Sequence, residues 1–178
     1  MNRLSASILP AYYWLFLILL YTPIGVLFLF SINDGIAFVF PLKGLTAHWY
    51  VDMLANAELM KALSNSALVA VVSSLAATAL GTFAAIALVR FNVAGKELFI
   101  AVALMPLLVP FLILGVALLI LFAALDIDRS LVTVTIAHSV VGLPYALLIM
   151  MSRLAGFDAS LEEAAQDLGA GYITVLRR

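Results

Sequence analysis

The chain has 178 residues, of which 66% are hydrophobic and 11% are charged, and its mean hydropathy is +1.20. Because soluble domains carry about 25% charged residues, this composition excludes a soluble enzyme domain and a disordered tail. A net charge of −1 offers no electrostatic footprint for nucleic acid, and a sequence without cysteine has no disulfide, thiolate nucleophile or cysteine-ligated metal.

Charged side chains are missing from four long stretches of the sequence, at 4–33, 62–89, 98–125 and 130–152. A helix that crosses the bilayer core needs about 20 apolar residues. A backbone in lipid must satisfy its own polar groups, which favours helices over open strands. The sequence therefore predicts an all-α fold, a polytopic membrane helical bundle in a single transmembrane domain over 1–178. The expected spans are about 11–31, 64–88, 99–123 and 131–151.

The first stretch differs from a cleaved signal peptide. Its apolar run at 14–30 is longer than an h-region of about 7–15 residues, and no Ala-x-Ala cleavage site follows it. We expect a retained span, with Tyr12, Tyr13 and Trp14 at the level of the lipid headgroups.

The segment over 32–61 is expected on the outer side of the membrane. Within it, Thr46 is a suitable N-cap for a short helix that runs through Leu54. Trp49 and Tyr50 would then lie at the membrane interface.

The basic residues predict the orientation of the chain. With the N-terminus in the cytoplasm, the cytoplasmic segments hold Arg3, Arg90, Lys96, Arg153, Arg177 and Arg178. The external segments hold only Lys43, Lys61 and Arg129. This excess on the inside agrees with the positive-inside rule and favours a cytoplasmic N-terminus.

Small residues recur at every fourth position in the second expected span. One series is Ala77, Gly81 and Ala85, and the other is Ser66, Ala70, Ser74 and Thr78. Such spacing lets helix backbones approach closely in lipid. Two interpretations stay open, close packing within the bundle and the lining of a pathway.

The third and fourth spans contain the candidate pathway or gating residues. Pro106 and Pro110 lie one helical turn apart and predict a kinked or broken helix, which either is structural or turns freed carbonyls toward a cavity. His138 is the one ionisable side chain within a span, and it serves either as a hydrogen-bonded bundle residue or as a functional group. We add Asn65, at the start of the second span, to these candidates.

The segment at 153–171 carries the most informative pattern. Ser160 and Glu163 fit a capping box that starts a helix, and Gly169 can end it in the left-handed conformation. One face of this helix is apolar and the other acidic; the apolar residues are Leu161, Ala164, Ala165 and Leu168, and the polar ones Glu162, Glu163, Gln166 and Asp167. A short acidic helix is expected in a protein groove lined by basic groups rather than on an anionic lipid surface. Packing on its own bundle is the alternative.

The series Glu163-Ala164-Ala165-xxx-Gly169 resembles the EAA loop of the inner-membrane permeases of binding-protein-dependent ABC importers. The resemblance covers nearly the whole chain and is greatest to the permeases of spermidine/putrescine importers. Other matching features are Trp49-Tyr50, Asn65-Ser66, Gly81 with Arg90, Gly95-Lys96, Pro106 with Pro110, His138, Leu143-Pro144, and 152–154 with 156–158.

The resemblance implies a type I ABC importer permease-like fold with four of about six transmembrane helices present, and so a chain cut off at its C-terminal end. It implies a multi-pass protein of the bacterial inner membrane that is not an enzyme and needs no cofactor or metal. The implied partners are a second permease subunit, a cytoplasmic ABC ATPase dimer and a periplasmic or lipid-anchored solute-binding protein. The loop over 152–178 would dock on the ATPase through Glu162, Glu163, Ala164, Ala165, Asp167, Leu168 and Gly169.

Two other functions compete with a polyamine permease. The first is an ABC permease for another small solute, such as an iron complex, a phosphonate or an anion. The second is a different class, an ion-coupled carrier or a membrane-embedded enzyme. The lack of charged residues within the spans disfavours that second class.

Overall fold

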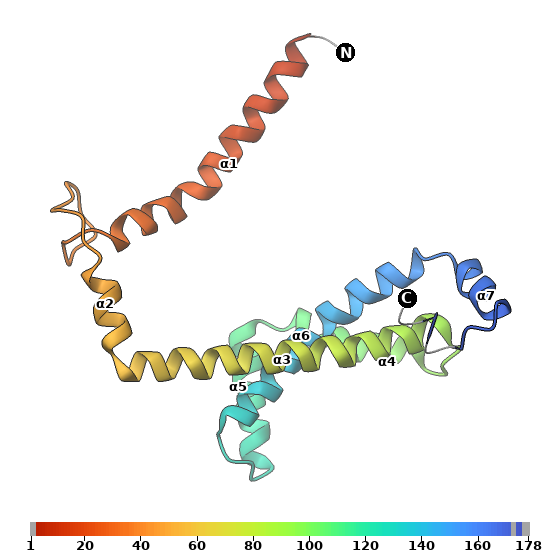
Figure 1. Cartoon of the computed structure of the whole chain (residues 1–178). Coiled ribbons are helices and arrows are strands. Elements are labelled where there is room, and N and C mark those ends of the chain that lie inside the picture. Colours follow the sequence, from red (N-terminus) through yellow and green to blue (C-terminus); the bar gives the residue numbers. More distant parts are fainter. Residues whose placement is uncertain (1–2, 172–173, 176–178) are drawn as a thin grey trace. The chain divides into compact units, whose positions relative to one another are not determined.

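A computed structural model describes residues 3–171 and 174–175 of the chain (Figure 1). Within these residues the regular structure is helical, as predicted. The helices are α1 (Arg3–Ser31), α2 (His48–Ala55), α3 (Ala57–Arg90), α4 (Lys96–Leu108), α5 (Phe111–Ala124), α6 (Leu131–Ala155) and α7 (Ala159–Asp167). Arg177 and Arg178, used above to predict the orientation, and part of the loop over 152–178 lie outside the described residues.

The chain forms two compact units, Met1–Leu63 and Ser64–Arg178. That both units belong to a single transmembrane domain stays a prediction from the sequence.

The first unit holds α1 and a folded loop. The stretch Leu9–Ser31 of α1 is long and apolar enough to cross a membrane, and Tyr12, Tyr13 and Trp14 are exposed on it. The loop that follows is organised by Asn33, which is buried.

Asn33 fixes the loop through both its side chain and its backbone. Its Oδ1 accepts a hydrogen bond from the Lys43 backbone N–H at 3.1 Å, and its carbonyl accepts one from Trp49 Nε1 at 2.9 Å. The predicted short helix is α2, which begins at His48. Its N-cap is Ala47 rather than Thr46, although the Thr46 hydroxyl does accept a bond from the His48 N–H at 3.1 Å.

The second unit is built on a close approach of α3 and α6. A Cβ added at Gly81 would lie 2.7 Å from Ala146 Cβ, and one added at Gly142 would lie 3.0 Å from Ala77 Cβ. Ala77 of α3 lies opposite Gly142 of α6, and Gly81 lies opposite Ala146. Because the residue numbers rise in the same direction along both helices, α3 and α6 are parallel.

This approach settles the role of one of the two small-residue series. Ala77, Gly81 and Ala85 are buried on α3, so this series serves close packing. The core continues with Leu88 of α3 and Leu147 of α6. In contrast, Ser66, Ala70, Ser74 and Thr78 are exposed in this structure.

The expected span over 99–123 is not one continuous helix. It divides into α4 and α5, which are bent by 112° relative to each other. Pro106 lies inside α4, and Pro110 directly precedes α5. Proline lacks a backbone donor and clashes with the preceding turn, and Val109, the residue before Pro110, is extended at φ −90° and ψ 129°.

The shared direction of α3 and α6 is relevant to whether α4 and α5 together form one membrane span. By length and composition α1, α3 and α6 can each cross a membrane, and α4 with α5 can form a fourth span. A chain that crosses twice in the same direction must return in between. If α3 and α6 both cross a membrane, α4 and α5 together would form the returning span, and the four spans expected from the sequence stay a prediction.

The candidate coupling helix and the Asn65–His138 hollow

Two residues, Phe157 and Asp158, separate helix α7 from the C-cap of α6. Gly156 caps α6, and Asp158 caps α7 by accepting a hydrogen bond at Oδ1 from the Ser160 backbone N–H at 3.0 Å. The capping box expected from Ser160 and Glu163 is therefore wrong, because the helix starts at Ala159 and Ser160 already lies inside it. The hydrogen bond from the Ser160 backbone, followed by that from the Ser160 hydroxyl, lowers the pKa of the Asp158 carboxyl.

Gly169 ends α7 as predicted. Its φ is +86°, in the left-handed region that only glycine adopts without strain. The Gly169 N–H donates to the Gln166 carbonyl at 2.8 Å, and the Ala170 N–H donates to the Ala165 carbonyl at 3.0 Å. This pair of bonds is a Schellman motif, so both ends of α7 are fixed by hydrogen bonds.

Glu162 lies against the chain's own bundle. It forms an ion pair with Arg90, the last residue of α3, through Glu162 Oε1 and Arg90 Nη2. The two side chains are only 18% and 15% exposed. The sequence predicted Glu162 on the side that meets a partner, and Arg90 was not among the predicted site residues. The signal in the sequence was a basic side chain at the end of a predicted span, which could pair with the acidic segment at 162–167.

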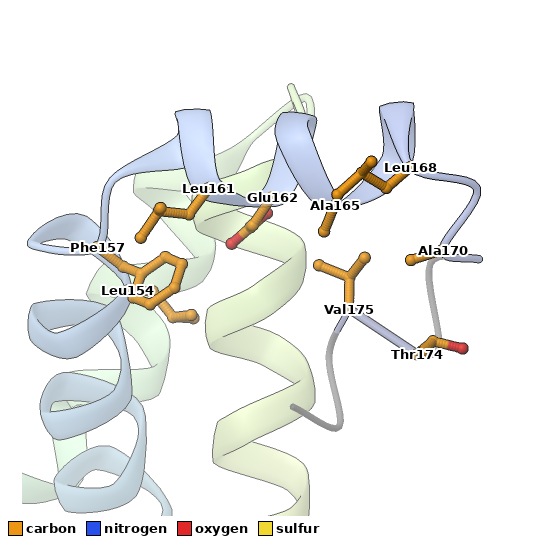
Figure 2. Close-up of a pocket in the computed structure, with 9 residues that line it drawn as sticks. All are labelled: Leu154, Phe157, Leu161, Glu162, Ala165, Leu168, Ala170, Thr174 and Val175. Carbon is orange, nitrogen blue, oxygen red and sulfur yellow. The ribbon is translucent and has the colours of Figure 1, made fainter.

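Most of the other acidic and apolar residues in and next to α7 are exposed. Glu163, Ala164 and Asp167 are exposed, and Leu168 is 90% exposed. Figure 2 shows Leu161, Glu162 and Ala165 projecting from the side of α7 that faces the other helices. The residues of the apolar face expected from the sequence thus differ in burial, with Ala165 half-buried and Leu168 90% exposed.

A hollow of about 490 Å³ lies beneath α7 (Figure 2). It is mostly apolar, with Glu162 as its acidic residue. The described residues that line it are Leu154, Phe157, Leu161, Glu162, Ala165, Leu168, Ala170, Thr174 and Val175.

Two of the four candidate pathway residues meet in space. Asn65 of α3 and His138 of α6 line a hollow of about 230 Å³ together with Val69 and Leu131. The His138 Nδ1–H donates to the Val134 carbonyl at 2.9 Å, the intrahelical bond expected of a bundle histidine.

The two prolines do not line this hollow. Pro106 and Pro110 instead define the break between α4 and α5. Within residues 3–171 and 174–175, no three His, Asp or Glu side chains gather closely enough to hold a metal ion.

Comparison with known proteins shows relatives among transport permeases. The chain is 34% identical over 159 residues to the spermidine/putrescine transport system permease protein PotC of Escherichia coli (strain K12), covering 89% of this chain and 60% of the relative. It is homologous to these permeases. The putrescine transport system permease protein PotI of the same organism is 36% identical over 163 residues, covering 88% of this chain and 58% of the relative.

The name of a more distant relative refers to a different solute. The probable molybdenum ABC transporter permease protein HVO_B0370 of Haloferax volcanii is 30% identical over 133 residues, covering 70% of this chain and 49% of the relative. No family model matches the chain. The resemblance derived from the EAA series is confirmed by these relatives, and the chain spans about 60% of the length of the PotC proteins it matches.

Proposed function

We propose that this chain is a transmembrane permease subunit of an ATP-driven importer for polyamines such as spermidine and putrescine. The observation that carries the proposal is the identity of 34–36% to PotC and PotI over almost nine tenths of the chain. Helix α7, fixed at both ends and presenting Glu163 and Asp167, supports a role as the element that contacts the cytoplasmic ATPase.

The proposal also covers the location of the subunit and its partner proteins. It is a multi-pass protein of the bacterial inner membrane with its N-terminus in the cytoplasm. It works with a second permease subunit, an ABC ATPase dimer and a periplasmic or lipid-anchored solute-binding protein. The pathway candidates that line one hollow are Asn65 and His138, while Pro106 and Pro110 lie at the break between α4 and α5.

A permease for another small solute is the second candidate, and the molybdenum transporter relative is the observation that favours it. Such a permease would import an iron complex, a phosphonate or an anion in place of a polyamine, so the two candidates differ in their cargo.

Uptake by living cells separates the two candidates. A strain that lacks the locus is compared with its parent for uptake of radiolabelled putrescine, spermidine and molybdate. We expect the deletion strain to lose polyamine uptake, to regain it with the native gene, and to keep molybdate uptake. Unchanged polyamine uptake in the deletion strain would contradict the proposal.

A further inference from the structure

The contact between Arg90 and Glu162 joins parts of the chain that are far apart in sequence. Arg90 ends α3, and Glu162 lies in the first turn of α7. The pair therefore bridges a separation of 72 residues. Because both side chains are more than four-fifths buried, water screens the contact much less than it screens a surface pair.

Helix α7 has a second attachment to the same bundle. Only Gly156, Phe157 and Asp158 separate it from α6, and Asp158 is held by the α7 backbone. Helix α6 in turn packs closely on α3, where Gly81 meets Ala146. A short rigid helix is thus tied to one bundle helix by the chain and to another by an ion pair.

We propose that Arg90 is a positioning residue that holds the coupling helix α7 in register with α3 through Glu162, so that movement of α7 is transmitted to α3 and α6 together. This inference rests on the proposed function. In this arrangement Glu162 serves the subunit's own bundle, while Glu163 and Asp167 remain for the partner.

The chemistry of the pair favours this role over a simple surface contact. Removing one partner of a buried ion pair leaves an unpaired charge, which is strongly destabilising. An arginine at a helix C-terminus is also favoured by the helix dipole. Lysine would keep the charge but offer a single point contact in place of the planar guanidinium.

The test is a charge swap in the assembled transporter. Arg90→Glu, Glu162→Arg and the double variant are compared with wild type for solute uptake, for ATP hydrolysis and for co-purification of the ATPase with the permease. We expect each single variant to lower the amount of solute imported per ATP hydrolysed by about tenfold, a typical coupling magnitude. We expect the double variant to recover most of that loss, and Arg90→Lys to show an intermediate value.

Arg153→Glu is the matched control. Arg153 lies in the last turn of α6, close to the same end of the bundle, and its side chain is exposed. This variant makes the same charge change without touching the pair, so we expect wild-type coupling. The inference is overturned if the single variants match the Arg153→Glu control, or if the double variant is no better than the singles.

The readouts keep this inference separate from the proposed function. If wild-type transporter imports no polyamine, the proposed function fails. Co-purification of the ATPase and its rate of hydrolysis can still be compared among the charge variants, because neither needs the solute to be known. A swap that restores both supports the role of Arg90 whatever the cargo is.

Discussion

At the scale of single residues, the left-handed backbone conformation of Gly169 is what ends α7. An added Cβ would meet no atom within 4 Å, so any effect of substitution comes from the backbone conformation alone. At φ +86° a β-branched residue is strained, and we expect Gly169→Val to weaken the end of α7 by about 1–2 kcal/mol. Asparagine tolerates this region better, so Gly169→Asn should cost less.

Hydrogen exchange measures this effect directly. The amides of Gly169 and Ala170 donate the two Schellman bonds, and we expect both to exchange faster in Gly169→Val than in Gly169→Asn or wild type. Equal exchange in all three proteins would contradict the assignment of strain to this position.

The Asp158 carboxylate gives the start of α7 a dependence on pH. Hydrogen bonds from Ser160 lower its pKa from the ordinary value of 3.8. A lowered pKa means that the stabilisation is complete above 3.8 and is lost as the pH falls through the shifted value. The cap should therefore hold at neutral pH and release only in strong acid.

The amide of Ser160 reports this titration by its NMR chemical shift in the solubilised chain. We expect a midpoint below 3.8. Asp158→Asn should keep a capped helix without the titration, and Asp158→Ala should lose the cap at every pH. A midpoint at or above 3.8 in wild type would rule out this account.

At the scale of elements, the packing of α3 on α6 depends on two glycines. At Gly81 an added Cβ would lie 2.7 Å from Ala146 Cβ and 2.9 Å from the Leu147 backbone nitrogen. Since backbone cannot turn aside as a side chain can, we expect Gly81→Ala to destabilise the fold by about 1–3 kcal/mol. Gly115, inside α5, is the control, because an added Cβ there meets nothing within 4 Å.

The two alanine variants should therefore act in opposite directions. Gly115→Ala is expected to be neutral or to stabilise the fold by about 0.4–1 kcal/mol. Denaturant or thermal unfolding of the purified protein in detergent compares them. A Gly81→Ala protein as stable as wild type would mean that α3 and α6 do not approach as closely as described.

Periodic patterns predicted the helices well, and contacts between distant residues were harder to predict. The position of Gly169 was predicted because few residue types suit a left-handed turn. For the series Ala77, Gly81 and Ala85, close helix packing was one of two interpretations that the sequence left open, and the spacing alone did not distinguish it from the exposed second series. The cap of α7 was misplaced because both Asp158 and Ser160 are good N-cap residues, and local sequence does not decide between neighbours.

The break after α4 and the partner of Glu162 show the limit of a one-dimensional pattern. Two prolines indicate that a helix is interrupted, but they do not predict the bend of 112° between α4 and α5 or that both helices contact α6. The sequence likewise marks Glu162 as a residue that needs a basic partner. Only the fold brings Arg90 to it across 72 residues.

At the scale of the whole molecule, the parallel course of α3 and α6 gives the second unit two distinct ends. The N-terminal parts of α3 and α6 meet where Asn65 and Leu131 line one hollow. Toward their C-terminal ends, Leu154 of α6 packs against the cluster that contains Leu88 of α3, and Arg90 of α3 reaches Glu162 of α7, the helix that follows α6. If α3 and α6 cross the membrane, the turn after α3 and the loop after α6 lie on the same side, and the turn before α6 lies on the other.

Single cysteines test this topology without background labelling, because the chain has no cysteine of its own. Asn92→Cys follows α3, Phe157→Cys follows α6 and Asp128→Cys precedes α6, and all three positions are exposed. In intact cells we expect a membrane-impermeant maleimide to label residue 128 alone, and to label 92 and 157 only after the inner membrane is opened. A re-entrant α4–α5 pair would instead put 92 and 128 on one side, so equal labelling at those two positions would contradict both the fourth span and the parallel course of α3 and α6.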